Sequence, residues 1–330
     1  MSILLFALCL QLAGTDSPKL SSTTRDPDAI EKLVRISRQK FPMADQLPGV
    51  VQIVRENRDD SIRVLALQAL AAFRTRARSE MPMLQELSGP GHPIEIRQSS
   101  LSTMVAIGGN SQDILQRLYA VIDHEQEPGL RQVAIGLIGK LRANDERAER
   151  ACLKCLEDAD PNVCSAAIAA VGSSEIVSDP VVARLRSLVY DERTRVRFYS
   201  PHVIGSSPLA VDAVECLEKL AIDDPATLKA LQEGLKKGEG RVQLACAISL
   251  QPLATAGDEE LLATCRAISA SDDIDSQLYL CLRIAEMRSQ WAQAPRVLAW
   301  LAVAEDVHVR KSVEVTMREI SGENQSFIWV

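Results

Sequence analysis

An internal repeat of about 33 residues constrains this sequence more than any other feature. Short segments such as Asp59–Arg63, Glu127–Arg131 and Asp306–Arg310 share an acidic first residue and a final Arg. We take the final position as the marker residue of each repeat. Marker residues recur at intervals of 34, 34, 33, 33, 46, 34 and 33, at Arg63, Arg97, Arg131, Cys164, Arg197, Gln243, Gln277 and Arg310. A unit of this length is one helical hairpin, which is too small to bury its own apolar face, so the hairpins must stack.

Positions that were not used to find the repeat follow the same period. Seven residues after the marker every residue is large and apolar: Leu70, Met104, Ile138, Val171, Ile204, Leu250, Ile284 and Met317. Three residues after it, six of eight are small: Ala66, Ser100, Ala134, Ala167, Ser200 and Cys246, with Leu280 and Val313 as the others. These two positions are one helical turn apart and share a face. Small residues there let a neighbouring helix approach closely.

Two further positions complete the predicted hairpin. Four residues before the marker, an acidic residue occurs in six of eight repeats, where it favours a helix N-terminus: Asp59, Glu127, Asp160, Glu239, Asp273 and Asp306. Twelve residues before the last five regular markers lies an apolar residue of a second helix: Cys152, Leu185, Leu231, Cys265 and Leu298. The marker arginines are expected to be structural and to pair with acidic residues of adjacent repeats.

The acidic start and the Ala-rich first helix, as in Arg131–Gly139, make the chain similar to the HEAT-repeat family. Within it the chain resembles the short repeats named after phycobilisome lyases. The resemblance covers about residues 26–322. The repeat and the resemblance together predict an all-α fold, an α-solenoid of the ARM/HEAT type with about eight to nine helical hairpins. Aromatic residues make up only 4% of the 330 residues, which fits thin helical layers, and no sustained strand alternation is evident.

The first 25 residues leave two interpretations open. The apolar run Ile3–Ala13 precedes Gly14 and a polar linker, which is typical of a signal peptide, but no Lys or Arg precedes it. The alternative interpretation is that this run is an apolar first segment that packs on the fold. The eight cysteines show no disulfide spacing and are predicted to be free core thiols, which favours a reducing compartment. The protein is therefore expected to be cytoplasmic or, if the run is a signal peptide, exported or periplasmic.

Two segments depart from the repeat. The 46-residue interval contains helix starts at Ser207-Pro208 and Asp224-Pro225, which predicts one extra helix inserted near 206–237. Such an insertion either contributes to a binding face or changes the curvature of the stack. The C-terminal tail, 323–330, contains Phe327, Ile328 and Trp329. It either folds over the last repeat or serves as a docking motif.

The sequence predicts no catalytic residues, no metal site and no cofactor. Cys152 and Cys155 have the spacing of half a zinc site, but the register places both in the core. His124-Glu125 is a single pair in a loop, and no glycine-rich phosphate loop or Gly-x-Ser-x-Gly motif is present. The net charge of −7 argues against nucleic acid as a partner, and no apolar run approaches the ~20 residues of a membrane span.

One row of residues is a candidate binding surface. In HEAT folds the second helices are expected to line the concave side, and positions fourteen and ten before the marker lie off their apolar stripe. Cationic and aromatic residues of the types found in binding hot spots occupy several of them: Arg150, Lys154, Lys229, Arg296 and Trp300. A partner with an acidic segment would fit this row. The alternative is ordinary solvated helix surface with Trp300 half-buried.

We therefore predict a non-enzymatic scaffold, expected to be a monomer, that holds a protein or peptide partner on the concave face of the solenoid. The alternative that the resemblance implies is a phycobilin-lyase-like enzyme, or another enzyme or chaperone for cofactor attachment, on the same fold. An absorbance titration with a bilin would distinguish the two. A third hypothesis, an interaction module exported to the cell envelope, differs from the first mainly in compartment.

Overall fold

The computed structural model describes residues 27–40, 42–200, 203–220, 224–250, 258–287 and 291–321. Over these ranges the chain forms 17 α-helices, two 3₁₀ helices and one β-hairpin. This is a helical repeat solenoid, as predicted. The predicted signal segment 1–25 and tail 323–330 lie outside them. In the described part of the chain, no helix is both long and apolar enough to cross a membrane.

The chain divides into two compact units, Met1–Gly108 and Gly109–Val330, which we describe separately. In unit 1, α2, α4 and α6 pack in sequence, while α3 packs on α4 and α5 on α6. The elements of unit 1 are α2 (Pro27–Arg38), η1 (Ala44–Gln46), α3 (Leu47–Glu56), α4 (Asp60–Ala71), η2 (Arg74–Glu80), α5 (Met81–Leu87) and α6 (Ile94–Gly108).

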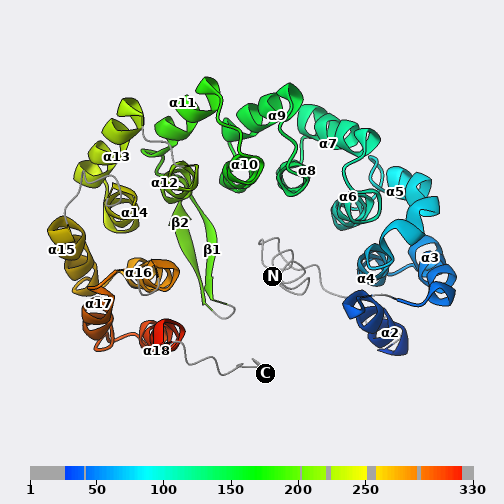
Figure 1. The fold of residues 1–330 in the computed structure, drawn as a ribbon. Coiled ribbons are helices and arrows are strands. Elements are labelled where there is room, and N and C mark those ends of the chain that lie inside the picture. Colours follow the sequence, from blue (N-terminus) through cyan, green and yellow to red (C-terminus); the bar gives the residue numbers. More distant parts are fainter. Residues whose placement is uncertain are drawn as a thin grey trace. The chain divides into compact units, whose positions relative to one another are not determined.

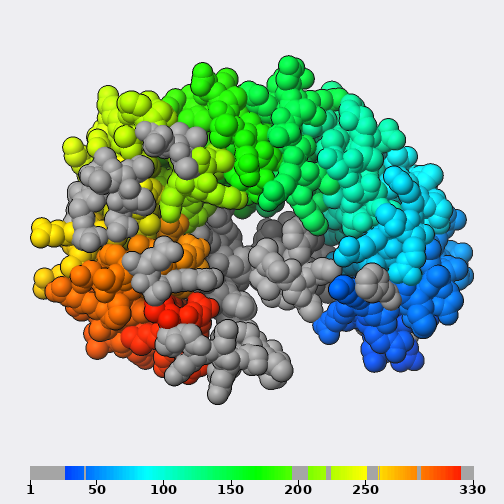
Figure 2. Space-filling view, viewed as in Figure 1, coloured from blue at the N-terminus to red at the C-terminus, as the bar shows by residue number. Residues whose placement is uncertain are grey.

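Unit 2 has two layers of helices (Figure 1). The inner layer consists of the first helices of the repeats: α8 (Pro128–Lys140), α10 (Pro161–Ser174), α12 (Leu209–Lys219), α14 (Gly240–Leu250), α16 (Ile274–Met287) and α18 (Val307–Ser321). The outer layer consists of α7 (Gln112–His124), α9 (Glu146–Leu156), α11 (Asp179–Leu188), α13 (Pro225–Lys237), α15 (Asp258–Ser269) and α17 (Ala294–Leu301). Each inner helix packs on the next inner helix. From α7 to α12 the side chains of consecutive hairpins abut without a gap (Figure 2).

The acidic residues predicted at helix starts act as N-caps in four repeats. The Asp160 carboxylate accepts a hydrogen bond from the Asn162 N–H at 2.8 Å, and Asp306 accepts one from His308 at 2.7 Å. Asp59 and Asp273 cap α4 and α16 in the same way. These bonds satisfy backbone donors that the first helical turn leaves without partners. Glu127 makes no such bond at the start of α8, in keeping with the poor capping preference of glutamate.

The predicted core positions are buried wherever the structure describes a regular helix. The two first-helix positions are at most 2% exposed at Leu70, Met104, Ile138, Val171, Leu250 and Ile284, and at Ala66, Ser100, Ala134, Ala167, Cys246, Leu280 and Val313. All five predicted second-helix residues are buried as well. Met317 is the exception, being 41% exposed, because α18 is the last helix of the described chain and no further hairpin covers it.

The extra element in the long interval is a β-hairpin, so the prediction of an extra helix near 206–237 is wrong. Strand β1 (Thr194–Ser200) pairs antiparallel with β2 (Val203–Pro208), from Thr194 opposite Pro208 to Ser200 opposite Val203. Both predicted helices exist, as α12 and α13, but α12 packs between α10 and α14 and is the first helix of a regular repeat. The hairpin precedes it, which also corrects the expectation that the chain has no strands.

The marker position of this repeat was consequently misplaced. Arg197 lies on β1, whereas the residue four positions after the N-cap of α12 is Asp212. The sequence contains the reasons. Position 193 is Arg rather than a helix-starting acid, and Pro201 interrupts any helix through this region. Polar and apolar residues also alternate from Arg195 to Phe198.

Helices α8 and α10 approach closely enough to require glycine. A Cβ added at Gly139 would lie 2.6 Å from Ala170 Cα and 2.8 Å from its Cβ. Gly136, on the exposed side of the same helix, has no atom within 4 Å of such a Cβ. Substitutions at the two glycines can therefore be compared to distinguish the effect of close packing at Gly139 from the low helix propensity that both glycines share.

We expect Gly139→Ala to lower the free energy of unfolding by about 1–3 kcal/mol, because the added methyl group overpacks the contact. The matched substitution Gly136→Ala is expected to raise it by about 0.5–1 kcal/mol, since alanine is the better helix former. Urea denaturation followed by circular dichroism measures both. A Gly139→Ala protein as stable as the parent would contradict the close approach of α8 and α10.

Candidate functional site

The five predicted binding residues lie on the outer layer of unit 2, not on its inner, concave side. Arg150 and Lys154 belong to α9, Lys229 to α13, and Arg296 and Trp300 to α17 (Figure 1). The expectation that second helices line the concave face is therefore wrong. The small residues that let first helices approach, such as Gly139 against Ala170, narrow the first-helix layer. A stack bends toward its narrower layer, which places the second helices outside.

The solvent-facing register of these residues is confirmed, but they do not form one patch. Arg150, Lys154, Lys229 and Arg296 are exposed and Trp300 is half-buried. The Arg296 guanidinium lies 5.2 Å from the centre of the Trp300 ring, a cation–π contact. The intervening outer helices carry exposed small residues at the same positions: Ala183 and Ser187 on α11, and Ala263 and Ala267 on α15.

The small residues on α15 leave a hollow of about 410 Å³ among α13, α14 and α15. Its lining residues are Leu235, Lys236, Gln243, Ala263, Thr264 and Ala267. Lys236 is the one charged residue among them, so this lining offers neither an acid–base pair nor a set of metal ligands.

The marker side chains have a structural task that the sequence only partly predicted. They donate hydrogen bonds to the carbonyl groups at the end of the preceding helix or just after it. Arg63 donates to Val54 O at 3.0 Å, Gln277 to Ser271 O at 2.7 Å, and Arg310 to Ala304 O and Glu305 O, each at 2.6 Å. The final carbonyls of a helix lack intrahelical donors, so this bond joins two consecutive helices.

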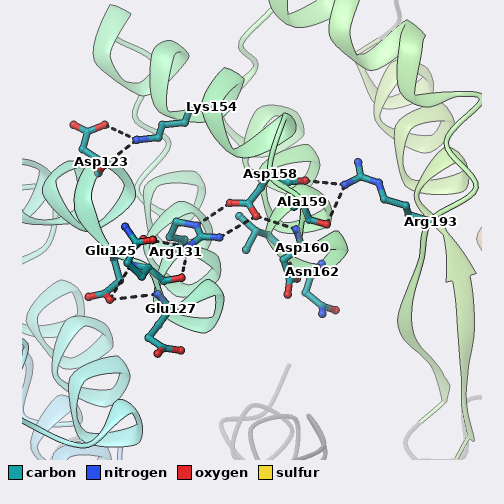
Figure 3. Close-up of polar contacts among 12 residues, drawn as sticks. Asp123, Glu125, Glu127, Arg131, Lys154, Asp158, Ala159, Asp160, Asn162 and Arg193 are labelled. Carbon is teal, nitrogen blue, oxygen red and sulfur yellow. Dashed lines mark hydrogen bonds and ion pairs between the residues drawn. The ribbon is translucent and has the colours of Figure 1, made fainter.

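Arg131 combines this task with the predicted acidic pairing (Figure 3). Its Nη1 donates to Glu125 O and Gln126 O at 3.1 and 2.7 Å. Its Nε and Nη2 donate to the two carboxylate oxygens of Asp158 at 2.7 and 3.0 Å. Asp158 lies in the turn before α10, and its backbone carbonyl accepts a bond from Arg193 at 2.7 Å. Asp158 therefore connects α8, the start of α10 and the base of the β-hairpin.

The environment of Asp158 lowers the pKa of its carboxyl group. Burial alone would raise this pKa, but the hydrogen bonds from Arg131 and from the Asp160 N–H, with the charges of Arg131 and Arg193, outweigh burial. The carboxylate side chain is 11% exposed. Because the folded pKa lies below the unfolded value of about 3.9, the ionised group stabilises the fold above that pH, and the contribution disappears as the pH falls through the folded pKa.

A second ionic cluster lies on the inner helices α12 and α16. Arg283 is 8% exposed, and its guanidinium lies 2.8 Å from Glu218, 3.5 Å from Glu215 and 3.4 Å from Glu286. The Tyr279 hydroxyl donates to Glu215 at 2.9 Å. Burial alone would lower the pKa of Arg283, but Tyr279 and the three carboxylates raise it above its ordinary range. Three carboxylates, from two helices, therefore surround this one guanidinium.

Asp212 adds a fourth carboxylate on the same helix, α12. It is 7% exposed and accepts a hydrogen bond from the Ser165 hydroxyl at 2.8 Å. We call Asp212, Glu215, Glu218 and Glu286 the inner acidic set. Sequence analysis missed it, because the misplaced marker hid the first-helix role of α12. The spacing of 212, 215 and 218 on one helix was the available signal.

The other chemical candidates occupy structural positions. Cys152 and Cys155 are buried, and burial raises the pKa of each thiol to about 12, so neither is a reactive thiolate. His124 is the exposed last residue of α7. Among the residues that the structure describes, no group of three or more His, Cys, Asp or Glu side chains is placed to hold a metal ion.

Comparisons with known proteins were made after this geometry. No family model matches the chain, and no curated protein matches it. Several solved structures resemble it at low sequence identity. Kap121p is 11% identical with a TM-score of 0.43, and the alignment covers 91% of this chain but 38% of Kap121p. The designed armadillo repeat protein YIII(Dq)4CqI is 15% identical with a TM-score of 0.28, covering 83% of this chain and 99% of that protein. An engineered protein is 15% identical with a TM-score of 0.26.

We expect Asp158→Asn to lower the free energy of unfolding at pH 7 by about 1–3 kcal/mol, because Arg131 loses its charged partner. The difference from the parent should shrink as the pH falls below about 4, where the parent carboxylate is protonated too. Asp123→Asn is the matched control, since the Asp123–Lys154 pair is about half exposed on both sides and should contribute less than about 0.5 kcal/mol. Denaturation curves from pH 7 to pH 3 measure all three proteins. A pH-independent deficit in Asp158→Asn would contradict the assigned role.

Proposed function

We propose that this protein is a non-enzymatic scaffold that holds an extended segment of a partner protein on the inner face of unit 2. One observation carries the proposal. The β-hairpin lies against the inner helices α10, α12, α14 and α16, and is seen on that side of unit 2 in Figure 1. An extended backbone therefore already fits across several consecutive inner helices. Stacked repeats present such a face over a length that one compact domain does not offer.

The predicted row of Arg150, Lys154, Lys229, Arg296 and Trp300 offers a different face for the same function. Its residues are accessible, and Arg and Trp are frequent in binding hot spots. Within unit 2, however, α11 and α15 separate the helices that carry the row. Arg296 also covers the ring of Trp300, which satisfies part of both side chains within α17. We therefore favour the inner face and use the outer row as the comparison.

A photo-crosslinking amino acid placed at Ala169 or at Ala183 tests the proposal. Both alanines are exposed and belong to the same repeat, but Ala169 lies on inner helix α10 and Ala183 on outer helix α11. Each variant is expressed at its native level in the native host, illuminated, purified and analysed by mass spectrometry. We expect one protein to be crosslinked in stoichiometric amounts from Ala169 and not from Ala183.

Crosslinks from Ala183 alone would overturn the choice of face. The absence of a crosslinked protein at both positions, in variants with the parent's melting temperature, would overturn the scaffold function itself.

The double substitution Arg296→Glu/Trp300→Ala tests the outer row directly. Because Trp300 is only half-buried, we expect it to lower the free energy of unfolding by about 1–2 kcal/mol and leave the chain folded. The yield of the Ala169 crosslink should stay within twofold of the parent. A loss of that crosslink from a folded double variant would place the partner on α17.

A further inference from the structure

The β-hairpin is an addition to a continuous inner layer. It extends the link between α11 and α12 to residues 189–208, whereas the equivalent links between repeats, such as 157–160 and 238–239, are short. Helix α12 packs directly on both α10 and α14, so the inner layer is continuous at this repeat. The two strands therefore add a backbone feature that the stacking of helices does not require.

The hairpin is a sheet of two strands, so each strand has one edge with which no other strand of the described chain pairs. In an antiparallel ladder, pairs that exchange backbone hydrogen bonds alternate with pairs whose N–H and C=O groups point away from the partner strand. The Leu209 N–H donates to Arg193 O at 2.8 Å, which makes the adjoining pair, Thr194 and Pro208, an outward-pointing one. By this alternation three residues of β1 direct their backbone groups to its outer edge: Thr194, Val196 and Phe198.

The two edges of the sheet are not equivalent. On β2 the same alternation selects Ile204, Ser206 and Pro208, and Pro208 has no N–H to donate. Every outward position of β1 carries both an N–H and a C=O group. Strand β1 contacts α10, whereas β2 contacts α12 and α14 (Figure 1). The outer edge of β1 is therefore the edge with the full set of donors, and a strand added there extends the sheet toward the earlier repeats.

The inner helix that β1 contacts is suited to a backbone lying close to it. Helix α10 contains no charged residue, so an approaching strand removes no charge from water. Ala169 is exposed on this helix, and Ala166 and Ser173 are half-buried. The Ser173 hydroxyl already donates to Ala169 O at 2.8 Å. These small side chains leave room for a strand beside β1, which would lie about 4.8 Å from it.

The base of the hairpin is fixed before any partner binds. The Arg193 guanidinium donates to the carboxylate of Asp191 at 2.7 Å and to the carbonyl groups of Asp158 and Ala159 at 2.7 and 3.3 Å. These bonds join the start of β1 to the turn before α10. An edge that is already extended and anchored at one end loses less conformational entropy on binding than a flexible segment does.

From these observations we infer that the outer edge of β1 binds the partner segment as a third strand of the sheet. The inference rests on the proposed scaffold function and names the recognition chemistry of the same face. Main-chain hydrogen bonds supply the affinity in this mode of binding. The partner is thus a protein with an extended segment of about five residues, which has no proline where it faces β1 and no charged side chain toward α10.

Two proline substitutions on opposite edges test the inference. Val196→Pro removes an outward N–H of β1, and Ile204→Pro removes one of β2, while both leave the hydrogen bonds between the strands in place. Each is combined with the photo-crosslinking amino acid at Ala169 and compared with the unsubstituted hairpin in the native host. We expect Val196→Pro to lower the yield of the crosslinked partner at least fivefold, and Ile204→Pro to leave it within twofold.

Hydrogen–deuterium exchange of the unsubstituted hairpin provides a second measurement, which does not depend on either variant folding. Exchange is compared between the protein alone and the purified crosslinked complex, with mass spectrometry that resolves single amides. The outward amides of Val196 and Phe198 should exchange at least tenfold more slowly in the complex, because they donate to the added strand. The outward amides of Ile204 and Ser206 should change less than twofold.

Equal crosslink yields from the two proline variants would overturn the inference, whether both fall or neither does, as would a loss confined to Ile204→Pro. Unchanged exchange at Val196 and Phe198 in the complex would overturn it as well. In these cases the parent crosslink at Ala169 still forms and the scaffold function stands. If the parent protein itself gives no crosslink, the scaffold function fails, and the inference fails with it.

Discussion

The bond between a marker side chain and the carbonyl end of the preceding helix determines how this chain stacks. It joins the two helices at every described marker whose side-chain bonds are resolved, with Arg, Gln or, at Cys164, a thiol that lies 3.4 Å from Leu156 O. A helix that ends against another helix cannot leave its last carbonyls to water, so the donor has to come from the neighbouring element. The first residues of the next helix are the nearest source. This explains why the marker recurs even though it contributes little to the apolar core.

The same requirement explains which parts of the fold could be predicted. A cap at the helix start, a donor four residues later and two core positions form a local code, and each part of it is visible in one sequence. Asp160, Ala167 and Val171 all take the predicted roles. The prediction fails where one residue matches the marker interval but the residue at the cap position does not match. Arg197 has the right interval, but Arg193 stands where the cap should be, and the polar–apolar alternation around it indicates a strand.

The position of the candidate site could not be predicted, for two different physical reasons. The curvature of a solenoid depends on small differences in width between its two layers, such as the contact of Gly139 with Ala170, and these differences are properties of packing rather than of a repeat pattern. The exposure of Arg150, Lys154 and Arg296 was therefore foreseen, but the side of the stack was not. The Arg283 cluster joins residues 215 and 283, which are far apart in sequence, and neither helix alone reveals it.

The β-hairpin is inserted between α11 and α12, and this connection differs from the other connections between consecutive repeats. The marker position there is Asp212, which as a carboxylate accepts hydrogen bonds but donates none, so it cannot cap α11 as Arg131 and Gln277 cap their preceding helices. Arg193, in the connection itself, instead reaches back to the turn before α10, where it donates to the carbonyl groups of Asp158 and Ala159. Because this connection is anchored by its own residue, Arg193, and not by the marker residue of the next helix, it tolerates a longer segment between α11 and α12.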